Sequence, residues 1–334
     1  MKPNATMLDA AGGKPLRLQS DKMETQFRLV VLGCLLAAGT AAQTPSKPSP
    51  GAYQAPQRTI CLRPAKIYLS PDSNAAVIGR ILPGQDVALM GISAGYAHVF
   101  ANVSGWMRNQ GLLPLTTPHG DHILMGAAIR LERQAENNPG EDRVAQNAAR
   151  LFYRVTDDFP GSPLVPEALF RAGRIAWQLN LSRYGTKKGT YNYMLRGRLL
   201  ERVLSKYPHT EWAARAAYQL LQKKLTCSDW IRKPSCIEKE GNVYRNYVQH
   251  FRTGPRTAEA IYEVAEHEAA AWWVYAQPGR KQNRGKSKSA KRKAEKWIAR
   301  LQKQYPKSDW AEESLFLSYE IQNGLRPAGL GLKS

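Results

Sequence analysis

The fold is decided by the stretch Val203-Leu204-Ser205-Lys206-Tyr207-Pro208-His209-Thr210-Glu211-Trp212-Ala213-Ala214-Arg215-Ala216. An apolar-periodic segment runs into an aromatic residue, a proline follows it, and an alanine-rich segment comes next. Proline ends the first helix because it lacks a backbone donor and clashes with the preceding turn. The stretch therefore predicts two helices joined by a tight turn, which is a helical hairpin.

The same pattern occurs four times along the chain. Its aromatic residue is Phe159, Tyr207, Phe251 or Tyr305. Apolar residues precede it by seven positions (Phe152, Leu200, Tyr244, Ile298) and by four (Val155, Val203, Tyr247, Leu301), and a small residue follows nine later (Ala168, Ala216, Ala260, Ser314). This spacing forms one face of a helix, and the small residue lets the second helix approach closely. Repeats of this kind stack on one another.

The composition limits the class of protein and of partner. With 334 residues, of which 43% are hydrophobic, the chain has room for two domains with cores of their own. Its formal net charge of +21 favours anionic partners. Charge alone does not separate nucleic acid from anionic lipid or another anionic polymer.

The first 42 residues read as a secretory leader. An apolar run over 29–38 follows Arg28, and the small residues 39–42 precede a polar stretch. We expect a signal peptide over 1–42, cleaved near Ala42, with Met1 or Met23 as its start; a core helix or a membrane anchor are the alternatives. Because Leu32 is large and the apolar run continues past Cys34, no lipid anchor is expected there. The Pro- and Ser-rich segment 43–57 reads as a linker.

Three cysteines follow the leader. Cys227 and Cys236 are separated by eight residues in a connecting segment, with Pro234 in an expected turn, and we expect a disulfide between them in an oxidising compartment. Cys61 reads as a buried small apolar residue.

Residues 58–117 have a different pattern from the hairpins. Short runs of period two alternate with Gly and Pro, which predicts four or five strands in a small all-β barrel or sandwich. Ser70-Pro-Asp-Ser73, Leu82-Pro-Gly-Gln-Asp-Val87, Tyr96-Ala-His-Val99 and Ser104-Gly-Trp-Met107 occur in the order typical of the bacterial SH3-like (SH3b) domain, which this segment resembles. The resemblance implies binding of cell-wall peptides or glycan. Tyr96 and Trp106 are candidates for a ligand-facing aromatic groove or, alternatively, for core packing.

Residues 118–334 form the predicted all-α repeat domain. The motifs from Phe159 to Ala168 and from Tyr305 to Ser314 resemble tetratricopeptide-like (TPR-like) repeats. They are most similar to those of outer-membrane assembly lipoproteins and periplasmic cell-division coordinators. The resemblance implies a non-enzymatic adaptor that binds envelope proteins or peptides. The fold expected for the whole chain is a small SH3-like barrel followed by a TPR-like helical solenoid.

Residues 279–293 are rich in cations and contain no carboxylate. The candidate contacts for an anionic lipid or polymer in this segment are Arg280, Lys281, Arg284, Lys286, Lys288, Lys291, Arg292 and Lys293. A solvated loop is the alternative interpretation. Nucleic acid shares this signature, but the expected export makes it the weaker partner. Trp272 and Trp273 just before the segment end a packed helix or contact a ligand.

No catalytic, metal or cofactor site is predicted. The sequence has no Cys–His grouping and no zinc motif. His119-Gly-Asp-His122 lacks further ligands, and we expect Asp121 to cap a helix that begins near Ile123. Glu263, Glu266, His267 and Glu268 are expected to be exposed. An exported envelope adaptor is therefore the leading hypothesis, with a cell-wall enzyme or a basic surface-binding protein as alternatives.

Overall fold

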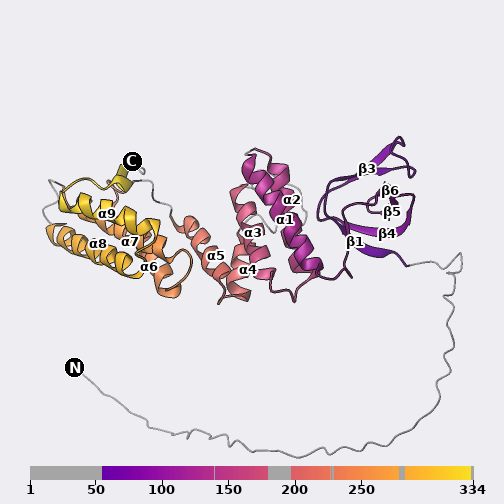
Figure 1. Cartoon of the computed structure of the whole chain (residues 1–334). Helices are drawn as coiled ribbons and strands as arrows, with labels where there is room; N and C mark the ends of the chain where they lie inside the picture. The colour runs from indigo at the N-terminus through magenta and orange to yellow at the C-terminus, as the bar shows by residue number, and fades with distance from the viewer. Residues whose placement is uncertain are drawn as a thin grey trace, which may run out of the picture. The chain divides into compact units, whose positions relative to one another are not determined.

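The computed structural model describes residues 55–138, 140–179, 197–225, 227, 229–277 and 283–331. The predicted leader 1–42, nearly all of the linker 43–57, and Arg280 and Lys281 lie outside the described residues. Within the described part, an antiparallel sheet comes first along the chain and helices follow it (Figure 1).

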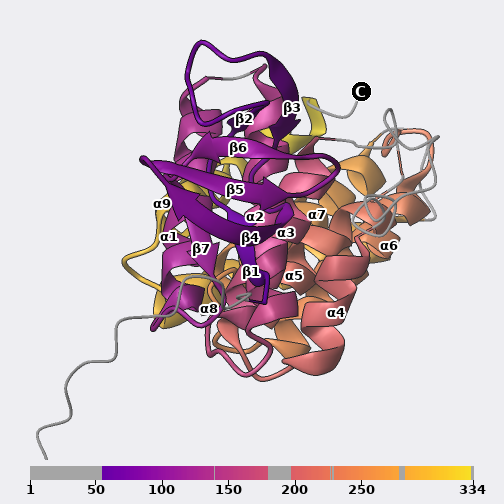
Figure 2. The same cartoon turned by 90° about the vertical axis from the view of Figure 1, so that its right-hand side faces the viewer.

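The sheet has seven strands in the order β3-β2-β6-β5-β4-β1-β7. Their bounds are β1 Gln57–Cys61, β2 Ala65–Tyr68, β3 Val77–Ile81, β4 Asp86–Ser93, β5 Tyr96–Phe100, β6 Ser104–Arg108 and β7 Leu112–Pro114. The strands β4, β5 and β6 lie side by side (Figure 2). The sequence pattern missed β1 and β7, which pair with each other, and β1 also pairs with β4.

Alternation places one face of the sheet in a small core. Ala97, Val99 and Met107 are fully buried, whereas their neighbours along the strands are partly or fully exposed. The hairpin between β4 and β5 turns at Ala94 (φ 48°) and Gly95 (φ 79°). Positive φ at both central residues matches the twist of the flanking strands. Gly84 also has positive φ (81°), in the turn between β3 and β4.

The helices follow as consecutive neighbours. Their bounds are α1 Gly120–Asn137, α2 Asp142–Asp158, α3 Val165–Gln178, α4 Arg198–Lys206, α5 Glu211–Leu221, η3 Gln222–Lys224, α6 Pro234–His250, α7 Thr257–Ala276, α8 Arg284–Gln304, α9 Asp309–Gln322 and η5 Ala328–Gly331. The four predicted hairpins are α2–α3, α4–α5, α6–α7 and α8–α9. All twelve residues at positions −7, −4 and +9 are buried, which confirms the predicted register.

The aromatic residue of each repeat ends the first helix of its hairpin. Each donates its backbone N–H to the carbonyl four residues back, and each side chain is half-buried. Thr210 and Ser308 then cap the second helix by accepting the N–H of Ala213 and of Ala311, at 3.2 Å each. In the third hairpin the equivalent residue is Gly254. A Cβ there would lie 3.0 Å from the Ala214 Cβ, so this glycine permits close contact with the second hairpin.

Salt bridges join the sheet to α2. Asp158, whose side chain is 1% exposed, lies 3.0 Å from the Arg58 guanidinium of β1 and accepts a hydrogen bond from Arg154 at 3.1 Å. Arg154 also contacts Asp86 of β4 at 2.7 Å. The sheet and the first hairpin are therefore fastened by charged groups at this contact.

Two local expectations were wrong. The helix α1 begins at Gly120, with His119 as its N-cap residue, so Asp121 lies in the first turn and does not cap it. Asp121 accepts the Ser162 hydroxyl at 2.6 Å instead. Pro234 is the first residue of α6 and not part of a turn, which suits proline because the first helical N–H has no intrahelical partner.

None of the helices in the described ranges combines the length and apolarity that a membrane crossing needs.

Candidate functional site

The helix α7 is covered on all sides by other elements. It packs against α6, α8, α9 and η5, and of its residues only Ala276 is exposed. His267 is 2% exposed and Glu268 is 8% exposed, so the expectation that both face solvent was wrong. Glu263 and Glu266, which were expected to be exposed with them, are half-buried, so α7 has no fully exposed stripe of the kind that alternating Glu and Ala predict.

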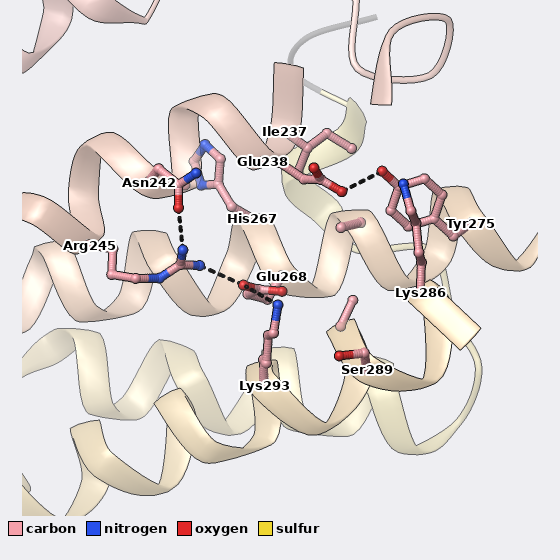
Figure 3. Close-up of a pocket in the computed structure, with 13 residues that line it drawn as sticks. Ile237, Glu238, Asn242, Arg245, His267, Glu268, Tyr275, Lys286, Ser289 and Lys293 are labelled. Carbon is pink, nitrogen blue, oxygen red and sulfur yellow. Dashed lines mark hydrogen bonds and ion pairs between the residues drawn. The ribbon is translucent and has the colours of Figure 1, made fainter. Parts of the chain in front are cut away.

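A cleft of about 260 Å³ lies between α6, α7 and α8. We call it the α6–α8 cleft. Its charged residues are Glu238 and Arg245 from α6, Glu268 from α7, and Lys286 and Lys293 from α8 (Figure 3). Three cations thus face two carboxylates, and the small residues Gly241 and Ala290 leave the space between the helices open.

Glu268 is the centre of the ionic contacts in the α6–α8 cleft. Arg245 donates to it at 2.6 Å and the Lys293 Nζ lies 3.8 Å away (Figure 3). Asn242 accepts a second hydrogen bond from Arg245 and holds the guanidinium toward the carboxylate. Burial raises the pKa of Glu268, although Lys293 and Arg245 act in the opposite direction.

A second pair closes the other end of the α6–α8 cleft. The Tyr275 hydroxyl donates to the Glu238 carboxylate at 2.7 Å, and the Lys286 Nζ lies 5.3 Å from the centre of the Tyr275 ring. Lys286 and Lys293 are exposed at the mouth, where a partner's anionic group would reach them. Such cations can pair with a carboxylate or phosphate group.

A buried polar cluster lies beside the α6–α8 cleft. Glu240, 1% exposed, accepts the backbone N–H of Cys227 at 3.0 Å and the indole N–H of Trp230 at 2.8 Å. The Trp230 ring lies 4.6 Å from the His267 ring. Cys227 and Cys236 form a disulfide, with 5.8 Å between their Cα atoms, which holds the segment that carries Trp230.

The basic segment forms a helix where a loop was one expectation. Residues from Arg284 onward belong to α8, which contains nine Lys or Arg and a single carboxylate, Glu295. Exposed cations on it are Arg284, Lys286, Lys288, Arg292, Lys293, Lys296 and Lys303, whereas Lys291 is half-buried with its Nζ 5.5 Å from the Trp272 ring. Within the described residues only Lys293 among them has an ion pair. The predicted charge run from Arg284 onward is therefore a helix whose surface is mostly cationic.

The four aromatic candidates lie in two places. Trp272 packs against α8 and Trp273 lies under the Arg326 guanidinium at 5.5 Å, so both are half-buried at helix contacts. Trp106 stacks on His98 at 4.7 Å, and Tyr96 meets the Tyr68 ring edge-on at 6.4 Å. Neither Tyr96 nor Trp106 belongs to the buried cluster of the sheet, so they form a half-exposed aromatic surface on its other face.

A second cleft, of about 390 Å³, lies between α1, α2 and α3. We call it the α1–α3 cleft. It is lined by the carboxylates of Glu132, Glu136, Glu141 and Asp142 and by one guanidinium, that of Arg174. The buried Glu132 accepts from Arg171 and, at 2.9 Å, from Arg174.

Among the described residues, no group of three or more His, Cys, Asp or Glu side chains is arranged so that it could hold a metal ion. The rings of His119 and His122 are 6.1 Å apart. Sequence reasoning missed Arg245 and Glu268 as cleft residues. The signal for Glu268 was its position seven after Ile261 and four after Val264, on the buried stripe of α7.

Comparisons with known proteins show no family. No protein-family model matches the sequence, and no curated protein matches it. Among solved structures, a de novo designed helical repeat protein is similar at 18% identity over 61% of this chain and 92% of that chain, with a TM-score of 0.22. A TM-score this low adds nothing to the fold described above, which is an antiparallel β domain followed by helical hairpins.

Proposed function

We propose that this protein is an exported, non-catalytic adaptor of the cell envelope. Its β domain is of the SH3-like kind and its hairpins are TPR-like, and each presents a surface to a protein or peptide partner, with peptidoglycan as a further ligand of the β domain. One observation carries the proposal: four hairpins share one buried register, and the third and fourth enclose a cation-rich cleft. Stacked helical repeats use such inter-helix surfaces for binding.

Export is tested by fractionation and N-terminal sequencing. The full chain, with a C-terminal epitope, is expressed in a bacterium and recovered from the cytosolic and envelope fractions. We expect the processed chain in the envelope fraction, beginning near Gln43. Unprocessed chain confined to the cytosol would contradict export and would leave the binding surfaces to be judged separately.

Partner binding at the α6–α8 cleft is tested by a photo-reactive residue at Ser289, which is half-buried in the cleft lining. The matched position is Gln134, an exposed neutral residue on α1. We expect discrete crosslinked partners from position 289 that disappear when Lys286 and Lys293 are changed to Glu. Identical products from both positions, or products that ignore the charge reversal, would contradict a partner at this cleft.

A basic surface-binding function is the second candidate, favoured by the exposed face of α8. Lys288, Arg292 and Lys296 follow one another every four residues and are exposed, with no ion pair among the described residues. Each cation near an anionic bilayer contributes about 1 kcal/mol, so reversing three weakens binding by about 100-fold or more. Sedimentation with phosphatidylglycerol vesicles measures this.

The matched control for α8 reverses Arg108, Arg130 and Arg133, which are exposed on β6 and α1. We expect the control to bind vesicles like the parent and added salt to release both. Equal loss in the two variants would show that net charge alone, and not the face of α8, governs the binding. Release of soluble glycan from purified cell wall would instead favour an enzyme.

A further inference from the structure

An aromatic residue stands eleven positions after the anchor of every hairpin. These residues are Phe170, Tyr218, Tyr262 and Phe316. In the first three hairpins the ring packs against the hairpin that follows. Ring centres are 5.5 Å apart for Phe170 and Trp212, 5.3 Å for Tyr218 and Tyr247, and 5.4 Å for Tyr262 and Trp310. Phe316, the fourth member, is 59% exposed.

The neighbours of this aromatic position show the same contrast. Ten positions after the anchor, Leu169 and Ile261 are fully buried, whereas Leu315 is 60% exposed. Fourteen positions after it, Leu221 is 8% exposed and Tyr319 is 55% exposed. Leu315, Phe316 and Tyr319, which we call the α9 face, are therefore the surface that each earlier hairpin uses to bind the next one.

The chain after α9 packs elsewhere. The Ala328 backbone N–H donates to the Glu320 carboxylate at 3.1 Å, and Leu330 is buried in a cluster with Ala270 and Val274 of α7. Of the residues that the structure describes, those from Leu325 to Gly331 thus cover α7 and leave the α9 face in solvent. An exposed apolar patch that is covered in its equivalents marks an interaction surface.

The charge of α9 and the contacts between earlier hairpins indicate what kind of segment would cover the α9 face. The helix α9 carries Asp309, Glu312, Glu313 and Glu320 and no Lys or Arg, and Glu312 and Glu313 are exposed beside Phe316. Both helices of the next hairpin cover α3: α5 contacts Phe170 through Trp212, and α4 presents Leu199 and Leu200 to Gly173. The helix α4 also carries Arg198, Arg202 and Lys206.

We propose that the α9 face binds an amphipathic helix of a partner protein, with an apolar stripe and flanking Lys or Arg. The apolar stripe covers Leu315, Phe316 and Tyr319, and the cations face Glu312 and Glu313. Pairing of two copies through this face would bring the acidic rims of both near each other, which is unfavourable. The proposal does not depend on where in the cell the protein works.

The test uses a labelled synthetic helix of about 18 residues, long enough to fold alone, with Leu at helical spacing and Lys on its flanks. Fluorescence anisotropy measures its binding to the full chain. Phe316→Asp is expected to weaken binding at least tenfold, and the matched control Phe100→Asp, at a residue 53% exposed on β5, to leave it within twofold. Glu312→Lys with Glu313→Lys is expected to weaken binding several-fold.

Because Phe316 and Phe100 are both exposed, each variant should fold, and far-UV circular dichroism checks this. Equal binding by the Phe316→Asp and Phe100→Asp variants would overturn the proposal. Sedimentation of the parent as a dimer that Phe316→Asp converts to a monomer would overturn it in favour of a second copy. A photo-reactive residue at position 316 that links to residues 1–54 of the same chain would overturn it in favour of an internal occupant.

Discussion

The α6–α8 cleft and the α1–α3 cleft have opposite charge balances. Three cations face two carboxylates in the α6–α8 cleft, whereas four carboxylates face one guanidinium in the α1–α3 cleft. Each contains a buried carboxylate held by two cations, Glu268 in the first and Glu132 in the second. The same helical repeats thus form clefts of different charge, and an anionic group is attracted to the α6–α8 cleft more than to the α1–α3 cleft.

The two buried carboxylates also differ in how completely they are paired. Glu132 is 4% exposed and contacts two guanidinium groups that are each 27% exposed. Glu268 has one guanidinium at 2.6 Å, and its second cation, Lys293, is 57% exposed at 3.8 Å. Glu132 therefore belongs to the structure of its cleft, while the Lys293 partner of Glu268 remains accessible to a ligand.

The largest expected effect tests the buried repeat positions that the hairpins share. Phe152 and Tyr244 occupy the same repeat position and are 0% and 7% exposed. Truncating either to Ala removes a buried ring and leaves a cavity, and we expect a loss of about 3–5 kcal/mol in the free energy of unfolding. Urea denaturation followed by circular dichroism measures it.

The control for this pair is Phe316→Ala, at a residue 59% exposed, which should change the free energy of unfolding by less than about 0.5 kcal/mol. A small loss in the free energy of unfolding for Tyr244→Ala, together with a large loss for Phe152→Ala, would contradict this prediction. It would mean that the third hairpin does not share the buried register of the first.

The next largest effect on the free energy of unfolding is expected at Glu132, the better-paired of the two carboxylates. Glu132→Gln leaves Arg171 and Arg174 with a neutral partner in a buried site, and we expect a loss of about 2–4 kcal/mol. Glu295→Gln is the control, because Glu295 is exposed on α8. Denaturation at neutral pH compares them, and a Glu132→Gln variant as stable as its control would show that the pairing is not structural.

Reduction of the disulfide distinguishes the two clefts further, because only the α6–α8 cleft has one beside it. Opening this nine-residue separation is expected to cost about 2–3 kcal/mol on the chain-entropy model. Melting of the parent with and without reductant measures it, and Cys227→Ser with Cys236→Ser should abolish the difference. A reductant effect that persists in this double variant would contradict the assignment of the sensitivity to the Cys227–Cys236 disulfide.

Much of the helical half was predictable from the chain itself. The anchor Tyr207 and the proline after it fixed where the first helix of the second hairpin ends, because proline acts on local backbone geometry. The small Ala216 marked the close helix contact for the same reason. The strands β1 and β7 were missed because β7 has three residues, too few to show alternation, and β1 is buried through its last three residues.

The site was harder to predict because it depends on which helices cover which. Glu268 and His267 read as solvent-facing on a single-helix pattern, yet α6, α8 and α9 enclose α7. The role of Arg245 in the cleft could not be predicted, because its partners Glu268 and Asn242 lie 23 and 3 positions away on two helices. The positive charge of the basic segment could be read from the sequence. That seven of the cations on α8 are exposed along one helix could not, because it depends on α8 beginning at Arg284.

The smallest expected effect depends on pH and concerns Glu268. Because burial raises its pKa above the usual 4.5, the folded protein favours the neutral acid. That contribution to stability is fully present below pH 4.5 and is lost as pH rises through the raised pKa. Glu268→Gln is neutral at every pH, so its melting temperature should exceed that of the parent by a margin that opens as pH rises. Parallel curves for the two proteins from pH 4 to pH 8, or a margin that narrows as pH rises, would mean that Arg245 and Lys293 fully compensate the buried charge of Glu268.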